Sequence, residues 1–128
     1  MNLSNPSQLL LRNIDSLASK TPLIINCPDA PLFDILQQHY PQCAPTSLHF
    51  NFADYNSVKL HCGDRVTSHF CANYSANIKH DLVIIYFPKS KDELAYTLSM
   101  ISPMLSKDAT LLFVGDNKGG VKSCQKLV

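Results

Sequence analysis

Two short apolar runs separated by one amphipathic helix constrain the fold of this chain more than any other feature. The runs cover 82–87 and 111–114, and both are too short to cross a membrane, which takes about 20 apolar residues. Apolar strands joined by a helical connection pair in parallel, and a parallel sheet is covered on both faces. The sequence therefore predicts an α/β fold with a mostly parallel five-stranded sheet and helices on both faces.

The helix between the two runs has clear signals at both ends. Ser90 and Glu93 are spaced as a capping box, in which each side chain accepts a hydrogen bond from the other residue's backbone amide. A core-facing stripe follows at helical spacing (Leu94, Leu98, Ile101 and Leu105). Pro103 has no backbone amide to donate, so we expect the helix to kink or end there.

Weaker patterns extend the alternation of strands and helices along the rest of the chain. We expect helices at about 7–19 and 31–39, and strands at 23–26, 48–52 and 67–71. The segment 53–66 is interpreted as a connection that turns at Gly63-Asp64. A last helix is expected to begin near Val121, because apolar residues recur at helical spacing from there to Val128.

Composition narrows the functional classes. A hydrophobic content of 45% with 16% charged residues is typical of a soluble globular protein, and 128 residues suffice for one domain. The formal net charge of +1 provides no overall attraction to nucleic acid or membranes, so such binding needs a local patch. The first residues have neither the basic start nor the apolar core of a signal peptide, so we expect a cytoplasmic protein.

The cysteines are odd in number and scattered, which favours reduced thiols (Cys27, Cys43, Cys62, Cys71 and Cys124). Two His/Cys pairs, His61-Cys62 and His69 with Cys71, raise the alternative of a metal site. Their spacing is looser than that of typical zinc ligands, so a partly buried strand is the preferred interpretation and no metal is expected.

The loop after the first strand argues against a cofactor at the usual place in such a sheet. Residues 26–31 contain two prolines and no glycine, whereas nucleotide and S-adenosylmethionine loops need glycine for close backbone approach. Asp54 could stand where an acid meets a ribose, but a solvated loop aspartate is the preferred interpretation. His80-Asp81 is interpreted as a polar pair leading a strand rather than an acid/base pair, because adjacent strand residues point to opposite faces.

Two segments at strand ends resemble a known family. They are Tyr-Phe-Pro-Lys-Ser-Lys at 86–91 and Val-Gly-Asp-Asn-Lys-Gly-Gly-Val-Lys-Ser at 114–123. They are similar to the Tyr-x-Pro-Lys-x-Lys turn and the Val-Gly-Glu-Asn-Arg-x-Gly-Val-Arg-Ser loop in the N-terminal domain of ribosomal RNA small subunit methyltransferase C. The likeness is specific over about 82–124, and the start at 7–13 also resembles that of the family.

The resemblance implies a Rossmann-like, degenerate methyltransferase-like fold and a place in a two-domain enzyme. In this family the second domain binds S-adenosylmethionine and methylates N2 of a guanine in 16S rRNA. The first domain, which 1–128 would represent as a single truncated unit without the catalytic C-terminal domain, aids RNA binding and folding. Tyr86-Phe87-Pro88-Lys89 stands in place of the catalytic Asn-Pro-Pro-Phe motif. We therefore expect no catalytic residue and no cofactor in this piece, and S-adenosylmethionine only in the full-length enzyme.

Four lysines follow the ends of the fourth and fifth strands and are the candidate RNA-binding residues (Lys89, Lys91, Lys118 and Lys122). Lysines at one sheet edge could meet phosphates of 16S rRNA in the small ribosomal subunit; the alternative is that they only keep the domain soluble. The other partner implied by the resemblance is the protein's own C-terminal domain, and no membrane is expected.

Three further interpretations stay open. The related 23S rRNA guanine-N2 methyltransferases share the duplicated architecture, so the chain could play the same role there. A stand-alone small-ligand-binding α/β domain is another alternative, with the loop 115–120 cradling an anion at a helix N-terminus. If later strands are missing, the strand 111–114 would be an exposed edge through which the fragment self-associates.

Overall fold

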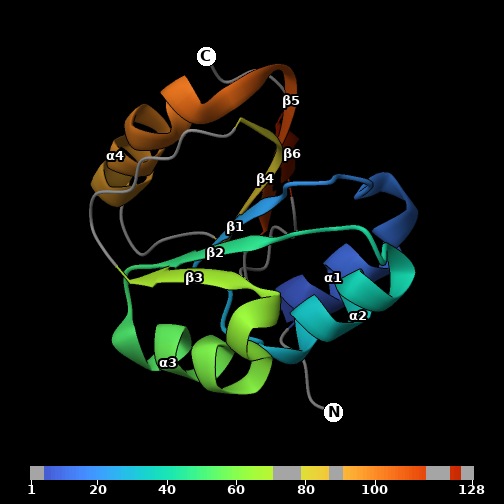
Figure 1. Cartoon of the computed structure of the whole chain (residues 1–128). Coiled ribbons are helices and arrows are strands. Elements are labelled where there is room, and N and C mark those ends of the chain that lie inside the picture. The colour runs from blue at the N-terminus through green and yellow to red at the C-terminus, as the bar shows by residue number, and fades with distance from the viewer. Residues whose placement is uncertain (1–4, 71–78, 87–90, 115–121, 125–128) are drawn as a thin grey trace.

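Six strands form one sheet in the order β3-β2-β1-β4-β5-β6 (Figure 1). The computed structural model describes residues 5–70, 79–86, 91–114 and 122–124. The strands are β1 (Leu23–Ile25), β2 (Thr46–His49), β3 (Thr67–Phe70), β4 (His80–Tyr86), β5 (Leu105–Val114) and β6 (Lys122–Cys124). The helices are α1 (Asn5–Arg12), α2 (Pro31–His39), α3 (Phe52–Cys62) and α4 (Lys91–Ile101). Short 3-10 turns cover Ile14–Ser16, Gly63–Arg65 and Ser102–Met104.

Five of these strands are parallel, which confirms the expected sheet. β1 pairs in parallel with β2 on one side and with β4 on the other, and β3 and β5 extend the parallel sheet outward. All three residues of β1 are completely buried. A strand without solvent contact on either face needs helices above and below it.

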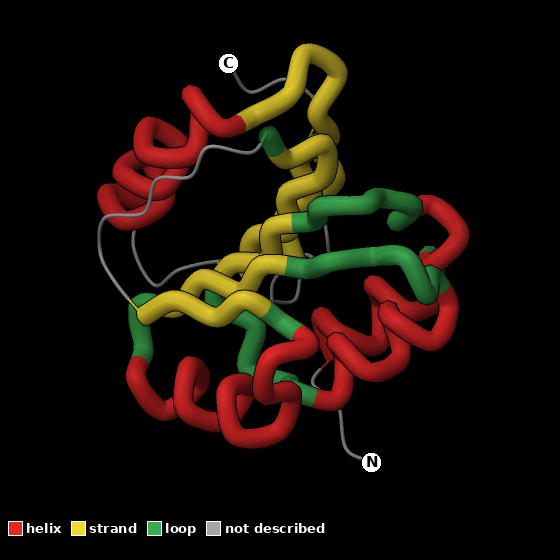
Figure 2. Tube along the Cα trace, viewed as in Figure 1, coloured by secondary structure: helices red, strands yellow, loops and turns green. Residues whose placement is uncertain are grey.

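Alternate strand residues serve two separate cores. Ile24 and Ile84 face α1, α2 and α3, whereas Ile25 and Ile85 face α4. Figure 2 shows the strands between these two helical layers. The expected helices on both faces are therefore present, and in the described part of the chain no helix has the length and apolar character to span a bilayer.

The connection expected at 53–66 is instead helix α3, and Phe52 begins this helix rather than ending a strand. The local cause is Asn51, whose side-chain oxygen accepts a hydrogen bond from the backbone amide of Asp54 at 3.1 Å. This is the geometry of a helix N-cap. The alternation of Leu48, Phe50 and Phe52 imitates a strand because the cap lies between the last two.

The end of the first helix and the start of β5 also differ from expectation, whereas the end of α4 agrees with it. α1 ends at Arg12 and a separate 3-10 turn follows, where one helix over 7–19 was expected. α4 ends at Ile101 and Pro103 lies in the next 3-10 turn, as the missing proline amide predicts. β5 begins directly afterwards and is longer than the expected 111–114. The capping residue Ser90 lies outside the described residues.

The helix expected from Val121 is wrong over 122–124, which form strand β6. β6 runs antiparallel to β5, with Leu111 opposite Cys124 and Phe113 opposite Lys122. Backbone pairing with the outer edge of β5 outweighs a local apolar spacing that fits only a few residues. The same pairing shows that 111–114 is not the exposed edge that was expected, because β6 of the same chain occupies it. Self-association of the fragment stays a prediction.

The N-cap of α3 makes a direct prediction. Asn51→Ala should lower the free energy of unfolding by about 1 kcal/mol, since the amide of Asp54 loses its acceptor. Urea denaturation followed by circular dichroism measures this change. Asn56→Ala, at an exposed position inside the same helix, is the matched control and should be neutral or slightly stabilising. Equal stability losses in both variants would contradict the capping role.

Candidate functional site

Loops that follow the parallel strands meet at one edge of the sheet, and ligands of open α/β sheets bind at this carboxyl edge. The loop after β1 carries Cys27 and Asp29, β4 ends at Tyr86, and α3 begins just after β2. These segments surround the corner where a nucleotide-like cofactor lies in related sheets. The side chains in this corner therefore determine what it can bind.

Asn26 turns the chain out of β1 in place of a glycine. Its φ is +63°, a left-handed conformation that asparagine tolerates better than most residues. Its backbone amide donates to the Leu48 carbonyl at 2.8 Å, and its side-chain oxygen accepts from the Phe50 amide at 3.0 Å. The loop is thereby tied to the end of β2.

A hydrogen-bond chain links α1, the loop after β1 and the end of β4. The Ser7 hydroxyl donates to Asp29 Oδ2 at 2.5 Å and lies 2.6 Å from the Tyr86 hydroxyl. Because the single Ser7 proton goes to Asp29, the Tyr86 hydroxyl is the donor to Ser7. Ser7 is 0% and Tyr86 is 5% exposed. The corner thus holds protein groups that satisfy one another.

Cys27 adds a neutral thiol to this corner. Burial raises its pKa to about 12, although a hydrogen bond between Cys27 and Tyr86 and another to the Asp29 backbone oppose the shift. Burial also raises the pKa of the Tyr86 hydroxyl. A thiol held in its protonated form is a poor nucleophile and a poor metal ligand. Burial therefore favours the protonated form of the Cys27 thiol in this corner.

Asp54 was expected in a solvated loop, but it lies in the first turn of α3. Burial raises its pKa, and the negative charge of Asp29 adds to the effect. The helix N-terminus accounts for the position of this acid, because a carboxylate there is favoured by the backbone dipole. The start of the helix is sufficient to explain why an aspartate lies at position 54, and no contact with a ribose has to be assumed.

His80 and Asp81, considered above as an acid/base pair, have different surroundings. His80 is buried, with Nδ1 2.8 Å from the Thr21 carbonyl, whereas Asp81 is exposed and accepts a hydrogen bond from the Ser19 hydroxyl. The two side chains therefore differ in burial, as expected for adjacent residues of a strand. Among the described residues, no cluster of three or more His, Cys, Asp or Glu side chains is arranged as a metal site. Cys71 lies outside them.

His61, considered above as a possible metal ligand, lies beside a carboxylate of the chain. Its Nε2 lies 2.5 Å from Asp34 Oδ2, and Arg65 Nη1 donates to Asp34 Oδ1 at 2.8 Å. Burial acts to raise the pKa of Asp34, but hydrogen bonds and charges from His61 and Arg65 outweigh it and hold this pKa below its usual value. The cluster joins α2 to α3, and sequence reasoning had not paired these residues.

The four candidate lysines are placed only in part. Lys91 opens α4 after β4, and Lys122 lies in β6 rather than at a helix start. Lys89 and Lys118 fall outside the described residues, and the side chains of Lys91 and Lys122 are not described. Their role as phosphate contacts stays a prediction.

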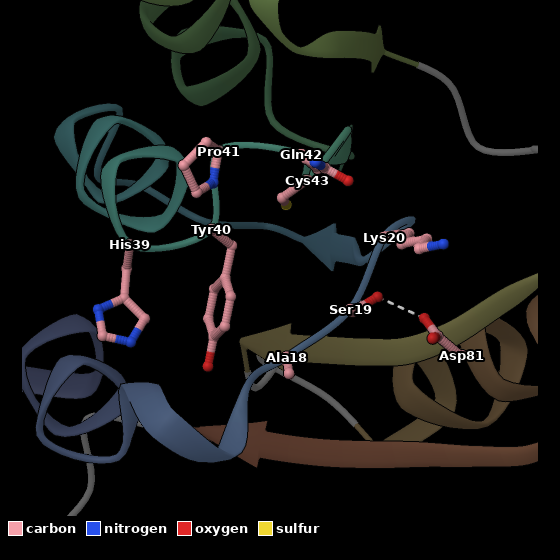
Figure 3. A pocket seen from close by; sticks show the side chains of 9 residues that line it. All are labelled: Ala18, Ser19, Lys20, His39, Tyr40, Pro41, Gln42, Cys43 and Asp81. Atoms are coloured by element: carbon pink, nitrogen blue, oxygen red, sulfur yellow. Dashed lines mark hydrogen bonds between the residues drawn. The ribbon is translucent and has the colours of Figure 1, made fainter.

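Sequence reasoning missed a hollow of about 600 Å³ at the opposite, amino edge of the sheet (Figure 3). It is lined by 18–20, 39–43 and Asp81. Several polar groups around it already have partners: the Tyr40 hydroxyl donates to the Ile14 carbonyl at 2.6 Å, and His39 Nε2 lies 3.0 Å from Asp15 Oδ1. No local sequence signal could reveal it, because its walls come from three separate segments of the chain.

The sequence from Ser7 to the end matches one family model. Residues 7–128 match the family described as "Methyltransferase small domain N-terminal". The chain belongs to this family.

Its curated relatives carry a more specific name. Ribosomal RNA small subunit methyltransferase C of Colwellia psychrerythraea is 40% identical over 132 residues, covering 99% of this chain and 37% of that protein. The protein of the same name from Pseudoalteromonas translucida is 40% identical over 124 residues, covering 97% of this chain and 36% of that protein. The chain matches their N-terminal part and spans little more than a third of their length.

Solved structures support the fold alone. The plantazolicin methyltransferase BpumL, solved with a triazolic desmethylPZN analog and SAH, superposes with a TM-score of 0.70 at 12% identity, covering 87% of this chain and 47% of that chain. Coclaurine N-methyltransferase superposes with a TM-score of 0.65 at 16% identity, covering 84% and 34%. The expected Rossmann-like methyltransferase fold is therefore confirmed.

His49, the last residue of β2, leads to a prediction of how stability depends on pH. It is completely buried, bonds Ser47 through Nε2, and burial lowers its pKa from 6.5 to about 4. Between these values the unfolded chain binds a proton that the folded chain does not, so the stability is lost as pH falls. Between pH 6.5 and 4, the free energy of unfolding of the wild type should fall by on the order of 3 kcal/mol more than that of His49→Gln. Parallel urea titrations at several pH values measure the difference; two parallel stability curves would contradict it.

Proposed function

We propose that this chain is the non-catalytic N-terminal domain of an S-adenosylmethionine-dependent 16S rRNA (guanine-N2)-methyltransferase. In this role it helps to bind rRNA in the small ribosomal subunit and supports the folding of a catalytic domain that follows it in the full-length cytoplasmic protein. The observation that carries the proposal is the filled corner, in which Ser7, Asp29 and Tyr86 bond one another, in a chain so similar to ribosomal RNA small subunit methyltransferase C.

The fold supports the division of labour between two domains. The methyltransferase sheet is retained, yet Asn26 and Cys27 stand after β1 where a cofactor loop has glycines. The length of the relatives leaves room for a second domain that supplies the cofactor site and the methyl transfer. The same role in a 23S rRNA guanine-N2 methyltransferase is the nearest alternative, and assays on isolated small and large subunits distinguish the two.

The lysine edge yields the first functional prediction. In the full-length enzyme, replacement of Lys89, Lys91, Lys118 and Lys122 by Glu should weaken rRNA or subunit binding. Each lost phosphate contact should also reduce the slope of log affinity against log salt by roughly 0.7–0.9. Filter binding at a series of salt concentrations measures both quantities.

The matched control reverses two exposed lysines away from the carboxyl edge, Lys20 before β1 and Lys107 near the start of β5. It should leave affinity and slope unchanged. Unchanged affinity of the four-lysine variant at low salt would show that these lysines only solubilise the domain.

The corner formed by Ser7, Asp29 and Tyr86 yields the second functional prediction. Isothermal titration of S-adenosylmethionine and S-adenosylhomocysteine into residues 1–128 should detect no binding, because Ser7 and Tyr86 occupy the corner. Full-length enzyme is the positive control and should bind. Micromolar affinity for the isolated chain would overturn the non-catalytic assignment and favour a ligand-binding α/β domain.

A further inference from the structure

Three aromatic side chains meet at the surface where β2 and β3 end. Phe52 and Tyr55 come from the start of α3, and Phe70 is the last residue of β3. The ring centroids are 5.4 Å apart for Phe52 and Phe70, 5.9 Å for Phe52 and Tyr55, and 5.7 Å for Tyr55 and Phe70. Phe52 is 57% and Phe70 is 48% exposed. We call these residues the ring cluster.

Side chains other than the ring cluster also attach α3 to the sheet. Val58 and Cys62 make that contact from the buried side of the helix, with exposures of 0% and 3%. Phe52 and Phe70 instead leave about half of their surface in water, and adjoining exposed rings are characteristic of interaction sites. Packing between α3 and β3 accounts for the ring contacts, but it does not account for the exposed surface of Phe52 and Phe70.

The position and surroundings of the cluster favour a nucleic acid base as its partner. Because β2 through β5 are parallel, the cluster lies at the same edge of the sheet as the connections that carry the candidate lysines after β4 and β5. Lys59 lies one turn after Tyr55 on the same side of α3, near enough to accompany a phosphate. Cations combined with aromatic stacking surfaces are the usual means of holding single-stranded RNA.

We propose that the ring cluster of Phe52, Tyr55 and Phe70 stacks an unpaired base of the bound RNA. The proposal rests on the proposed RNA-binding function but adds a separate contact. Stacking recognises the flat face of a base and depends weakly on salt, whereas lysines recognise phosphates and depend strongly on it. The two contributions are therefore separable by experiment.

The test compares ring removal with removal of charge. The double variant Phe52→Leu, Phe70→Leu keeps apolar side chains at both positions but removes the flat rings. Tyr96→Leu, which removes a 48% exposed ring from α4, is the matched control. The probe is a fluorescent single-stranded RNA of about eight nucleotides, beside an abasic strand with the same backbone. Both are titrated into residues 1–128 at several salt concentrations.

The double variant should bind the RNA roughly 10- to 100-fold more weakly, with an unchanged salt slope and unchanged affinity for the abasic strand. Tyr96→Leu should bind as the wild type does. Since the chain has five tyrosines and no tryptophan, binding should also quench tyrosine emission, and Tyr55→Phe should reduce that quenching while affinity is kept.

Other outcomes overturn the inference in distinguishable ways. If ring removal leaves RNA affinity within about twofold while the four-lysine variant loses it, the stacking contact is wrong and the proposed function stands. Loss of self-association in the double variant without loss of RNA affinity would make the cluster a protein-docking surface instead. If the wild type binds neither strand even at low salt, both the stacking contact and RNA binding by this domain are wrong.

Discussion

The rest of the structure depends on the parallel pairing of β1 between β2 and β4. Three residues, Leu23, Ile24 and Ile25, are buried on both faces and hold backbone hydrogen bonds on both edges. This arrangement requires a helical layer on each side, and it places the connections after β1 through β5 at one edge. The corner, the ring cluster and the predicted lysine edge all result from that one constraint.

The corner explains how a methyltransferase-like sheet can keep its shape without a cofactor loop. Asn26 adopts the left-handed turn and bonds the end of β2, while Ser7 brings α1 against Asp29 and Tyr86. A buried network whose members satisfy one another stabilises the arrangement it closes. The network therefore ties α1 to the ends of β1 and β4 through groups of the chain itself.

The sequence predicted the elements whose signal is local and continuous. The runs at β4 and β5, the helix α2 and the break at Pro103 are all present. α3 was missed because only Val58 and Cys62 on it are buried, so its apolar stripe is weak, and the cap at Asn51 is hidden between aromatic residues. β6 was missed because its pairing with β5 is a tertiary interaction. The hydrogen bond between Ser7 and Tyr86 was missed because the two residues are separated by 79 positions in the chain.

The carboxyl edge combines two regions with opposite tolerance to change. Ser7 and Tyr86 are buried partners, so removal of either hydroxyl deletes a buried hydrogen bond, which costs about 0.5–1.5 kcal/mol. Phe52 and Phe70 are about half exposed, and their helix is held by other residues, so substitutions there cost little stability. Large aromatic side chains at positions that the fold does not require are best explained by a partner outside the domain. The closed corner preserves the sheet, and the exposed rings beside it are free to serve binding.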